Sequence, residues 1–204
     1  MNREIDKKLA IKISKKFFEI IVGPKYSSEA IKILKRKNNL IILKINLKVL
    51  NTRDYKQTLF GKLYQDYNSI KINKGFIKLV SSKKNNSKIL EDLIFSLKVV
   101  KHMKSNAVVI ATNKQTIGMG QGQTNRIDSI KLALKQIKGK AYSKKIVCAS
   151  DGFFPFNDSL SLLNKNNCQI VAQPSGSIND KNSVRFAIKN KMSLYFTKSR
   201  LFKH

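Results

Sequence analysis

The sequence lacks several features that mark specialised classes of protein. It has no tryptophan, two cysteines, three prolines and two histidines in 204 residues. Its longest apolar runs, such as Leu40–Leu43, fall far short of the ~20 residues that a membrane-spanning helix needs. The first residues, Met1–Glu4, are polar and contain no apolar signal-peptide core. The sequence therefore predicts a globular protein of the reducing cytoplasm, without a membrane-spanning segment.

The two cysteines exclude a further set of functions. Cys148 and Cys168 are too far apart in the sequence for a redox motif or for a pair of zinc ligands. A disulfide-stabilised secreted domain is equally disfavoured, because such domains are rich in cysteine.

Acidic residues are scarce: 12 face 41 basic residues, which gives a formal net charge of +29. One interpretation is that the protein binds a polyanion such as a nucleic acid, because clustered lysine and arginine neutralise phosphates. However, arginine is rare, and the lysines are spread along the chain in runs no denser than Lys35–Lys37. Lysine, asparagine and isoleucine all have A/T-rich codons, so codon bias explains the mixture. We favour a solvated lysine-rich surface over a nucleic-acid interface.

The first eighty residues show a β-α-β rhythm, which is typical of parallel strands. Gly23-Pro24 breaks the first strand, and Ser27 or Ser28 can cap the following helix. The lysine-rich stretch Ser81–Ser87 is the expected boundary, which gives domains 1–80 and 81–204. The expected elements are a helix over Glu4–Lys16, a strand over Phe18–Val22, a helix ending near Lys37, a strand over Leu40–Asn46 and a hairpin near Leu59–Tyr67.

The second part of the chain alternates helices and strands and predicts an α/β sheet. Apolar residues between Ile89 and Val100 recur at three- and four-residue spacing, so this helix has a core-facing side. Ligands of open α/β sheets bind at the carboxyl ends of strands. The other expected strands are 107–111, 115–119, 146–149, 169–172 and 193–196, and the other helices are 124–138, 158–166 and 180–189.

Five segments near these strand ends carry candidate ligand groups. They are Lys104–Ala107, Gly118–Arg126, Ser150–Asp158, Gln173–Asp180 and Thr197–His204. Three stretches of the chain predict a site for a phosphorylated small molecule: Lys104–Arg126, which contains the first two segments, Ser150–Asp158 and Thr197–His204. Glycines at 118, 120 and 122 let a backbone approach a ligand, and a helix N-terminus favours an anion. Their spacing fits neither the dinucleotide fingerprint nor a P-loop.

Each segment also has an ordinary structural explanation. Asn106 fits a turn, the glycines fit a tight β-α connection, and the phenylalanines after Ser150 fit the core. The segment Gln173–Asp180 fits a helix cap, and the C-terminal residues fit a frayed tail. From the residues alone, both sets of explanations stay open.

Taken together, the segments resemble one family. The matching motifs are Lys104–Ala107, Thr116–Gln123 with Arg126, Ser150-Asp151 with Phe153–Phe156, Pro174–Ser177 and Arg200–His204. In this order they resemble the C-terminal part of the AICAR formyltransferase (transformylase) domain of the bifunctional purine-biosynthesis enzymes, which are also IMP cyclohydrolases. Asn2–Asp6 and Phe17–Ile21 resemble the same family, so the resemblance covers nearly the whole chain.

The resemblance implies a cytidine-deaminase-like fold of α/β/α layers, truncated at its N-terminus. It also implies transfer of a formyl group from 10-formyltetrahydrofolate to AICAR in a homodimer, without zinc, membrane or nucleic acid. Zinc deaminases share that fold but use a His/Cys ligand set that this sequence lacks. The implied residues are Asn106, Arg126, Phe153 and Arg200 against AICAR; Ile127, Asp158, Ser177 and Ile178 against folate; and Pro155, Phe202 and His204 as further site residues.

The sequence departs from the family at its acid–base pair. That pair is a Lys-His followed shortly by proline, and the resemblance places it upstream of Met1, so no catalytic residue is expected in this chain. Lys101-His102 continues as Met103-Lys104, and we interpret His102 as a residue at the end of a helix. Gly152 stands where alanine is usual and Asn157 where arginine is usual.

These departures leave three hypotheses. The first is a C-terminal fragment of the formyltransferase that retains most of the substrate-binding wall. The second is a non-catalytic remnant or binding module that needs a separate upstream fragment for activity. The third is a basic nucleic-acid-binding protein, which the salt dependence of binding would reveal.

Overall fold

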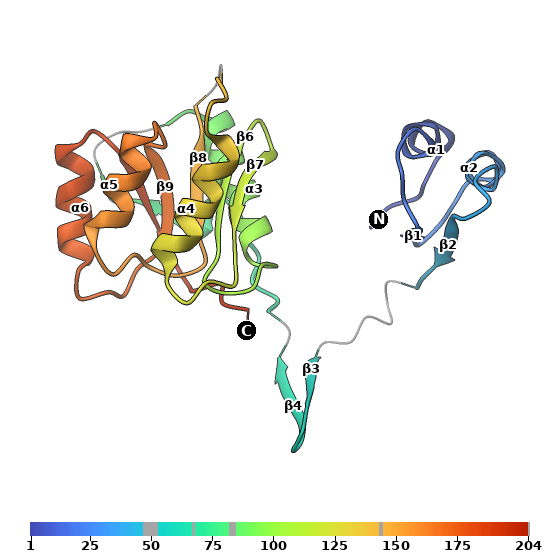
Figure 1. Ribbon diagram of the computed structural model, residues 1–204, viewed down its shortest axis with the longest axis horizontal. Coiled ribbons are helices and arrows are strands. Elements are labelled where there is room, and N and C mark those ends of the chain that lie inside the picture. The colour runs from blue at the N-terminus through green and yellow to red at the C-terminus, as the bar shows by residue number, and fades with distance from the viewer. Residues whose placement is uncertain (47–52, 67, 82–84, 143–144, 204) are drawn as a thin grey trace. The chain divides into compact units, whose positions relative to one another are not determined.

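The computed structural model describes residues 1–46, 53–66, 68–81, 85–142 and 145–203 (Figure 1). The chain divides into two compact units, Met1–Tyr67 and Asn68–His204. Within the described residues, no helix combines the length and the apolar character that a bilayer crossing requires.

The first unit contains the expected β-α-β rhythm. Its elements are helix α1 (Lys7–Ser14), strand β1 (Ile20–Gly23), helix α2 (Ser28–Leu34) and strand β2 (Ile41–Lys44). The two strands are parallel, with Ile20 opposite Ile41, which confirms the prediction. Ser27 is the cap of α2, since its Oγ accepts a hydrogen bond from the Ala30 amide at 3.1 Å.

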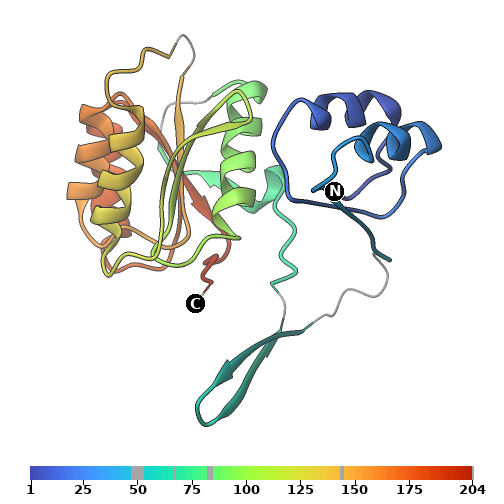
Figure 2. The same cartoon turned by 45° about the vertical axis from the view of Figure 1, so that its right-hand side comes forward.

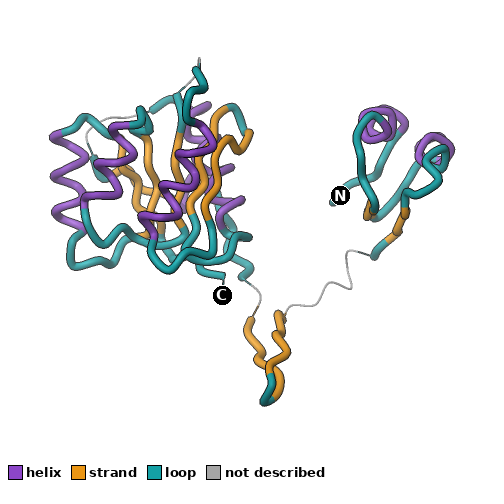
Figure 3. Tube along the Cα trace, in the orientation of Figure 1, coloured by secondary structure: helices purple, strands orange, loops and turns teal. Residues whose placement is uncertain are grey.

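The same unit contains the expected hairpin, although its first strand begins earlier than predicted. Strand β3 (Arg53–Thr58) pairs antiparallel with β4 (Gly61–Asp66) (Figure 3). Leu59 and Phe60 form the turn and are 97% and 99% exposed. The prediction started at Leu59 because the polar residues of β3 lack the alternation that marks a strand. Tyr67 lies outside the described residues.

The second unit is built on a six-stranded mixed sheet with the order β5-β10-β9-β8-β6-β7. Strands β8, β9 and β10 are parallel, whereas β5, β6 and β7 run antiparallel to their neighbours. The sheet confirms the predicted α/β class. The strands are β5 (Ile77–Leu79), β6 (Val108–Thr112), β7 (Gln115–Gly120), β8 (Val147–Ser150), β9 (Ile170–Pro174) and β10 (Ser193–Thr197).

Because strand β5 belongs to the six-stranded sheet, the boundary between the two units lies earlier in the chain than the expected boundary between residues 80 and 81. Leu79 pairs with Tyr195 and Ile77 with Thr197, so the chain from Asn68 onward belongs to the second unit. The lysine-rich stretch after Val80 is therefore a connection within that unit. Its residues 82–84 lie outside the described residues.

Helices cover both faces of this sheet (Figure 2). One face carries α4 (Arg126–Ile137), α5 (Asn157–Lys165) and α6 (Asp180–Lys189), and the other carries α3 (Ser87–Val100). Leu93, Leu97 and Val100 of α3 are fully buried, which confirms that its apolar side is core. Each helix of the α4–α6 face begins after the loop that follows a strand: β7 for α4, β8 for α5 and β9 for α6.

The two cysteines meet in the core although they are distant in the sequence. Cys148 lies on β8, and Cys168 lies two residues before the start of β9, the neighbouring parallel strand. A hydrogen bond with the Cys168 thiol, together with burial, raises the pKa of Cys148 well above its ordinary value. Both thiols are free, and Cys148 is therefore held protonated as part of the packing.

Candidate ligand site

The five predicted segments lie at one edge of the six-stranded sheet. Val108, at the start of β6, is opposite Gly120 at the end of β7 and opposite Ser150 at the end of β8. Parallel pairing brings the ends of β9 and β10 to the same edge, with Pro174 opposite Thr197. The chain end emerges from this edge as well (Figure 1). We call it the ligand edge.

An ion pair between Arg126 and Asp151 forms the centre of the ligand edge. The Arg126 Nη2 lies 2.9 Å from Asp151 Oδ1, and the two side chains are 10% and 0% exposed. The same Nη2 donates to Asn106 Oδ1 at 2.8 Å, and Nη1 donates to the Phe153 carbonyl at 3.0 Å. One guanidinium thus joins the start of α4 to two predicted site segments, in the forked geometry that arginine favours.

Asn106 is fixed on its other side by the glycine-rich turn. Its Nδ2 donates to the carbonyls of Gln123 at 2.9 Å and Thr124 at 3.1 Å. Its own carbonyl accepts a hydrogen bond from Ser129 Oγ at 2.7 Å, and the Ser105–Asn106 peptide bond is cis. Hydrogen bonds thus hold both the side chain and the carbonyl of Asn106, as an ordinary turn residue does not require.

Two of the three glycines serve packing. A Cβ on Gly120 would lie 1.9 Å from the Ser129 carbonyl oxygen, and one on Gly118 would lie 2.3 Å from that of Ala133. Both would collide with the backbone of α4, so the tight β-α connection is the right explanation for them. Gly122 instead adopts a φ of +66°, and its amide donates to the Lys104 carbonyl at 2.9 Å.

The C-terminal segment is bonded to the site through residue 203, so the frayed-tail explanation is wrong there. The Leu201 amide donates to the Asp151 carbonyl at 2.8 Å, and the Ser105 amide donates to the Lys203 carbonyl at 2.9 Å. The exposed Arg200 guanidinium lies 5.1 Å from the Phe153 ring centroid and 5.8 Å from that of Phe202. His204 lies outside the described residues.

The three phenylalanines after Ser150 have different environments. Phe154 is fully buried in the core, Phe153 is half-buried beneath Arg200, and Phe156 is 66% exposed. The Phe154 amide donates to Oε1 of the buried Gln173 at 2.9 Å. The core explanation holds for Phe154, whereas a role of Phe153 as a wall for a flat ligand stays a prediction.

The predicted folate-side residues occupy the N-terminal ends of three helices. Ile127 is in the first turn of α4, Asp158 is in the first turn of α5, and Ser177 precedes α6 beside the fully exposed Ile178. The α5 N-cap is Phe156, while Asp158 accepts from the Ser159 amide at 2.6 Å.

The loop that carries Pro155 is tied to the loop before α6. The Pro155 carbonyl accepts a hydrogen bond from Asn179 Nδ2 at 2.8 Å. The Asp180 carboxylate, in the first turn of α6, accepts from the Gly176 amide at 2.8 Å and so ties the loop to the helix. The α6 N-cap, Asn179, makes no side-chain capping hydrogen bond, so this segment is not explained by a side-chain cap.

Sequence reasoning missed the importance of Asp151 and Ser105. Their side chains meet at 2.5 Å, where Ser105 Oγ donates to Asp151 Oδ2. The available signal was an acidic residue directly after a buried strand in a chain with few acidic residues.

His102 lies on the connection that leads from α3 to Asn106. Burial, together with the positive charges of Lys101 and Lys203, lowers the pKa of His102 below its ordinary value. The imidazole is thus neutral at neutral pH.

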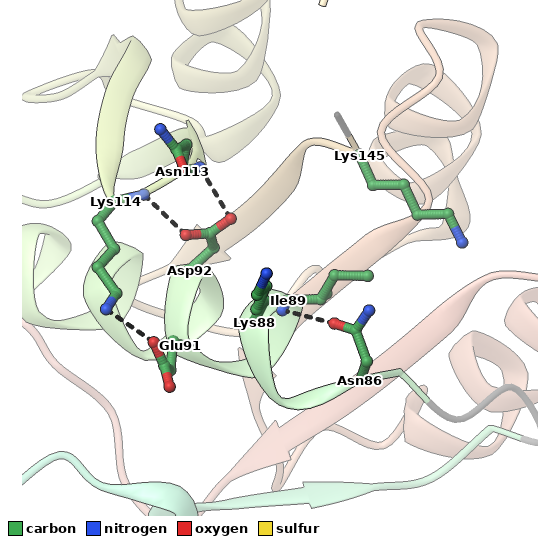
Figure 4. A pocket seen from close by; sticks show the side chains of 8 residues that line it. All are labelled: Asn86, Lys88, Ile89, Glu91, Asp92, Asn113, Lys114 and Lys145. Atoms are coloured by element: carbon green, nitrogen blue, oxygen red, sulfur yellow. Dashed lines mark hydrogen bonds and ion pairs between the residues drawn. The ribbon is translucent and has the colours of Figure 1, made fainter. Parts of the chain in front are cut away.

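A cavity of about 540 Å³ lies at the opposite edge of the same sheet, beside the β6–β7 turn (Figure 4). Asp92 accepts hydrogen bonds from the amides of Asn113 and Lys114, and Glu91 pairs with Lys114 at 2.7 Å. None of the predicted site residues lines this cavity. Within the described residues, no group of three or more His, Cys, Asp or Glu side chains could hold a metal ion.

Comparisons with known proteins agree on one family. Residues 1–136 match the family described as AICARFT/IMPCHase bienzyme. The bifunctional purine biosynthesis protein PurH of Acetivibrio thermocellus is 43% identical over 207 residues, and that of Fusobacterium nucleatum is 40% identical over 205. The PurH of Petrotoga mobilis is 41% identical over 203 residues. Each alignment covers the whole of this chain, which spans about 40% of the length of these relatives.

Proposed function

The chain belongs to the AICARFT/IMPCHase bienzyme family, and from that premise we propose that its ligand edge binds AICAR for formyl transfer in IMP biosynthesis. In that reaction the 5-amino group of AICAR attacks the formyl carbon of 10-formyltetrahydrofolate. The amine loses a proton, the bond from the formyl carbon to N10 breaks, and N10 gains a proton. The products are the formamido ribonucleotide and tetrahydrofolate.

The observation that carries the proposal is the placement of two different arginines at one edge. Arg126 is buried and its charge is paired with Asp151, whereas Arg200 is exposed and stacks on Phe153. A paired, buried cation has little charge left for a phosphate, so we assign the phosphate of AICAR to Arg200. Phe153 would then lie against the imidazole ring, with Phe202 beside it.

Asn106 has a specific capacity left for a ligand. Both donors of its Nδ2 are used by backbone carbonyls, and Arg126 uses one lone pair of its Oδ1. The second lone pair of Oδ1 is available to accept an N–H of the AICAR amino or carboxamide group. We therefore assign Asn106 to orienting the reacting amine.

The folate donor belongs on the α4–α6 side of the ligand edge in this proposal. Ile127 and Ile178 would contact its apolar rings, and Asp158 and Ser177 would accept or donate hydrogen bonds. We propose in addition that the layers are of the cytidine-deaminase type and that two copies of the chain complete the site. We assign substrate binding and positioning to these residues and no proton transfer.

Calorimetric titration of the 204-residue chain with AICAR tests this proposal. We expect binding to the ribonucleotide and a loss of roughly tenfold in affinity in Arg200→Gln, because a bond to a charged group contributes about 1.5 kcal/mol or more. The riboside without phosphate should bind wild type and variant equally. Arg185→Gln, at an exposed position of helix α6, is the matched control. Absence of AICAR binding, or equal affinities for Arg200→Gln and wild type, would refute the assignment.

A further inference from the structure

We propose that Asp151 is the positioning residue of the ligand edge, a role that rests on the proposed function. Its carboxylate holds Arg126 on one side and Ser105 on the other. Through these two contacts it sets the geometry of Asn106, Arg200 and Phe202.

The contacts of Asp151 connect three separate segments. Oδ1 lies 2.9 Å from Arg126 Nη2, and Oδ2 accepts from Ser105 Oγ at 2.5 Å. Its amide donates to the Ala107 carbonyl at 3.2 Å, and its carbonyl accepts from the Leu201 amide at 2.8 Å. With its side chain 0% exposed, Asp151 interacts with protein groups rather than bulk water.

The guanidinium of Arg126 transmits this geometry to Asn106. Nη2 bridges the carboxylate of Asp151 and the amide oxygen of Asn106, so one group orients the other. The buried Nε of Arg126 has no hydrogen-bond acceptor in the described part of the chain. The hydrogen bonds of the guanidinium are therefore all made by its two Nη atoms, where Asp151 supplies the anionic contact, and the Phe202 ring centroid lies 6.0 Å from Cζ.

Ser105 transmits the geometry to the C-terminal segment. Its Oγ donates to Asp151 and accepts from the Lys203 amide at 3.2 Å. That bond and the Leu201 amide bond flank Phe202 and hold the segment beside Arg200. One carboxylate therefore aligns the orienting amide and the free cation relative to each other.

Gly152 leaves the space that this arrangement needs. A Cβ there would lie 2.4 Å from Arg126 Nη2 and 2.6 Å from Phe202 Cε1. The guanidinium and the ring thus close over a residue without a side chain.

Two variants and a matched control test the role of Asp151. Asp151→Asn keeps the shape and removes the charge, while Ser105→Ala removes only the second contact of the carboxylate. Ser96→Ala also removes a buried hydroxyl, whose bond is to the Asp92 carbonyl on α3. Three quantities are measured: the AICAR affinity by calorimetry, the midpoint of thermal unfolding, and the NMR signal of the Arg126 Nε–H group. The NMR signal is assigned by its disappearance in Arg126→Lys.

We expect Ser105→Ala to weaken AICAR binding about tenfold while its thermal midpoint falls no further than that of Ser96→Ala. We expect Asp151→Asn to shift and broaden the Arg126 Nε–H signal, which Ser96→Ala should leave unchanged. Wild-type affinity in Ser105→Ala, or an unchanged signal in Asp151→Asn, overturns the proposal. If Asp151→Asn does not fold, the AICAR affinity of Ser105→Ala alone tests the proposal: a tenfold loss supports it and wild-type affinity overturns it.

The failure of this inference is distinguishable from failure of the proposed function. If the wild-type chain binds no AICAR, the proposed function fails. The Nε–H signal still reports, without ligand, whether Asp151 orients Arg126. A signal that is unchanged in Asp151→Asn would show that other contacts fix the guanidinium, whether or not AICAR binds.

Discussion

The two edges of the six-stranded sheet each contain a buried carboxylate, and the two carboxylates bind different kinds of group. Asp92, at the edge with the cavity, accepts from two backbone amides of the β6–β7 turn. Asp151, at the ligand edge, accepts from the side chains of Arg126 and Ser105. Backbone partners stabilise a turn whatever its side chains are, whereas side-chain partners require those particular residues. Asp92 therefore stabilises the conformation of a turn, whereas Asp151 organises the side chains of the ligand edge.

The turn beside Asp92 explains why that edge needs an acid. Asn113 and Lys114 have φ angles of 52° and 55°, in the left-handed region that L-residues other than asparagine rarely adopt. The carboxylate compensates by accepting from both amides. Lys114 additionally pairs with Glu91, so much of the charge around the cavity is balanced within the protein (Figure 4).

The largest expected effect comes from deleting each carboxylate in turn. Asp151→Ala leaves the guanidinium of Arg126 buried without its anion, which costs about 3–5 kcal/mol of unfolding free energy. Asp92→Ala leaves two backbone amides without their acceptor, but water can partly solvate them. We therefore expect a loss of about 2 kcal/mol of unfolding free energy. Urea unfolding of the two variants measures both values.

Asp128→Ala, in the first turn of α4, removes a partly exposed carboxylate that pairs with Lys131 at the surface, and it controls for the loss of one negative charge. A larger loss of stability for Asp92→Ala than for Asp151→Ala would contradict the distinction between the edges. So would an Asp151→Ala variant as stable as Asp128→Ala.

The second effect concerns the close approach of β7 to α4 at the ligand edge. Gly120→Ala would place a Cβ against the Ser129 carbonyl, and neither backbone can yield without shifting the helix. We expect a cost of about 3 kcal/mol in urea unfolding. Gly75→Ala is the control, because its Cβ would meet only the flexible Asn73 side chain, and it should cost about 0.5 kcal/mol. Equal stabilities would show that α4 is not seated on β7 as described.

Local patterns in the sequence predicted most elements of the fold. The periodicity of α3, the Ser27 cap and the parallel pairing of β1 with β2 follow from spacing and capping alone. The convergence of the ligand segments followed from the rule that strand ends share an edge. Strand β5 was missed, because three residues give too short a pattern and their pairing with β10 depends on distant parts of the chain.

The candidate site was predictable as a set of segments but not as a network. Asn106, Arg126, Phe153 and Arg200 were identified because their motifs resemble one family. The contact between Ser105 and Asp151 joins residues that are 46 positions apart, so nothing local reveals it. Which of the three phenylalanines is buried in the core also depends on contacts with the sheet, which the local sequence does not reveal.

The smallest expected effect concerns the pH dependence of the ion pair at the edge with the cavity. The hydrogen bond with Lys114 and its positive charge lower the pKa of Glu91 below its usual 4.5, and the same contact raises the pKa of Lys114 above 10.5. The stabilisation from Glu91 is therefore fully present above pH 4.5 and is lost as the pH falls through the lowered pKa. The stabilisation from Lys114 is present below pH 10.5 and is lost as the pH rises through the raised pKa.

A double-mutant cycle of Glu91→Gln and Lys114→Met, followed by urea unfolding, should give a small coupling free energy at neutral pH and none in strong acid. A coupling that persists in acid would mean that the two side chains interact by packing rather than by charge.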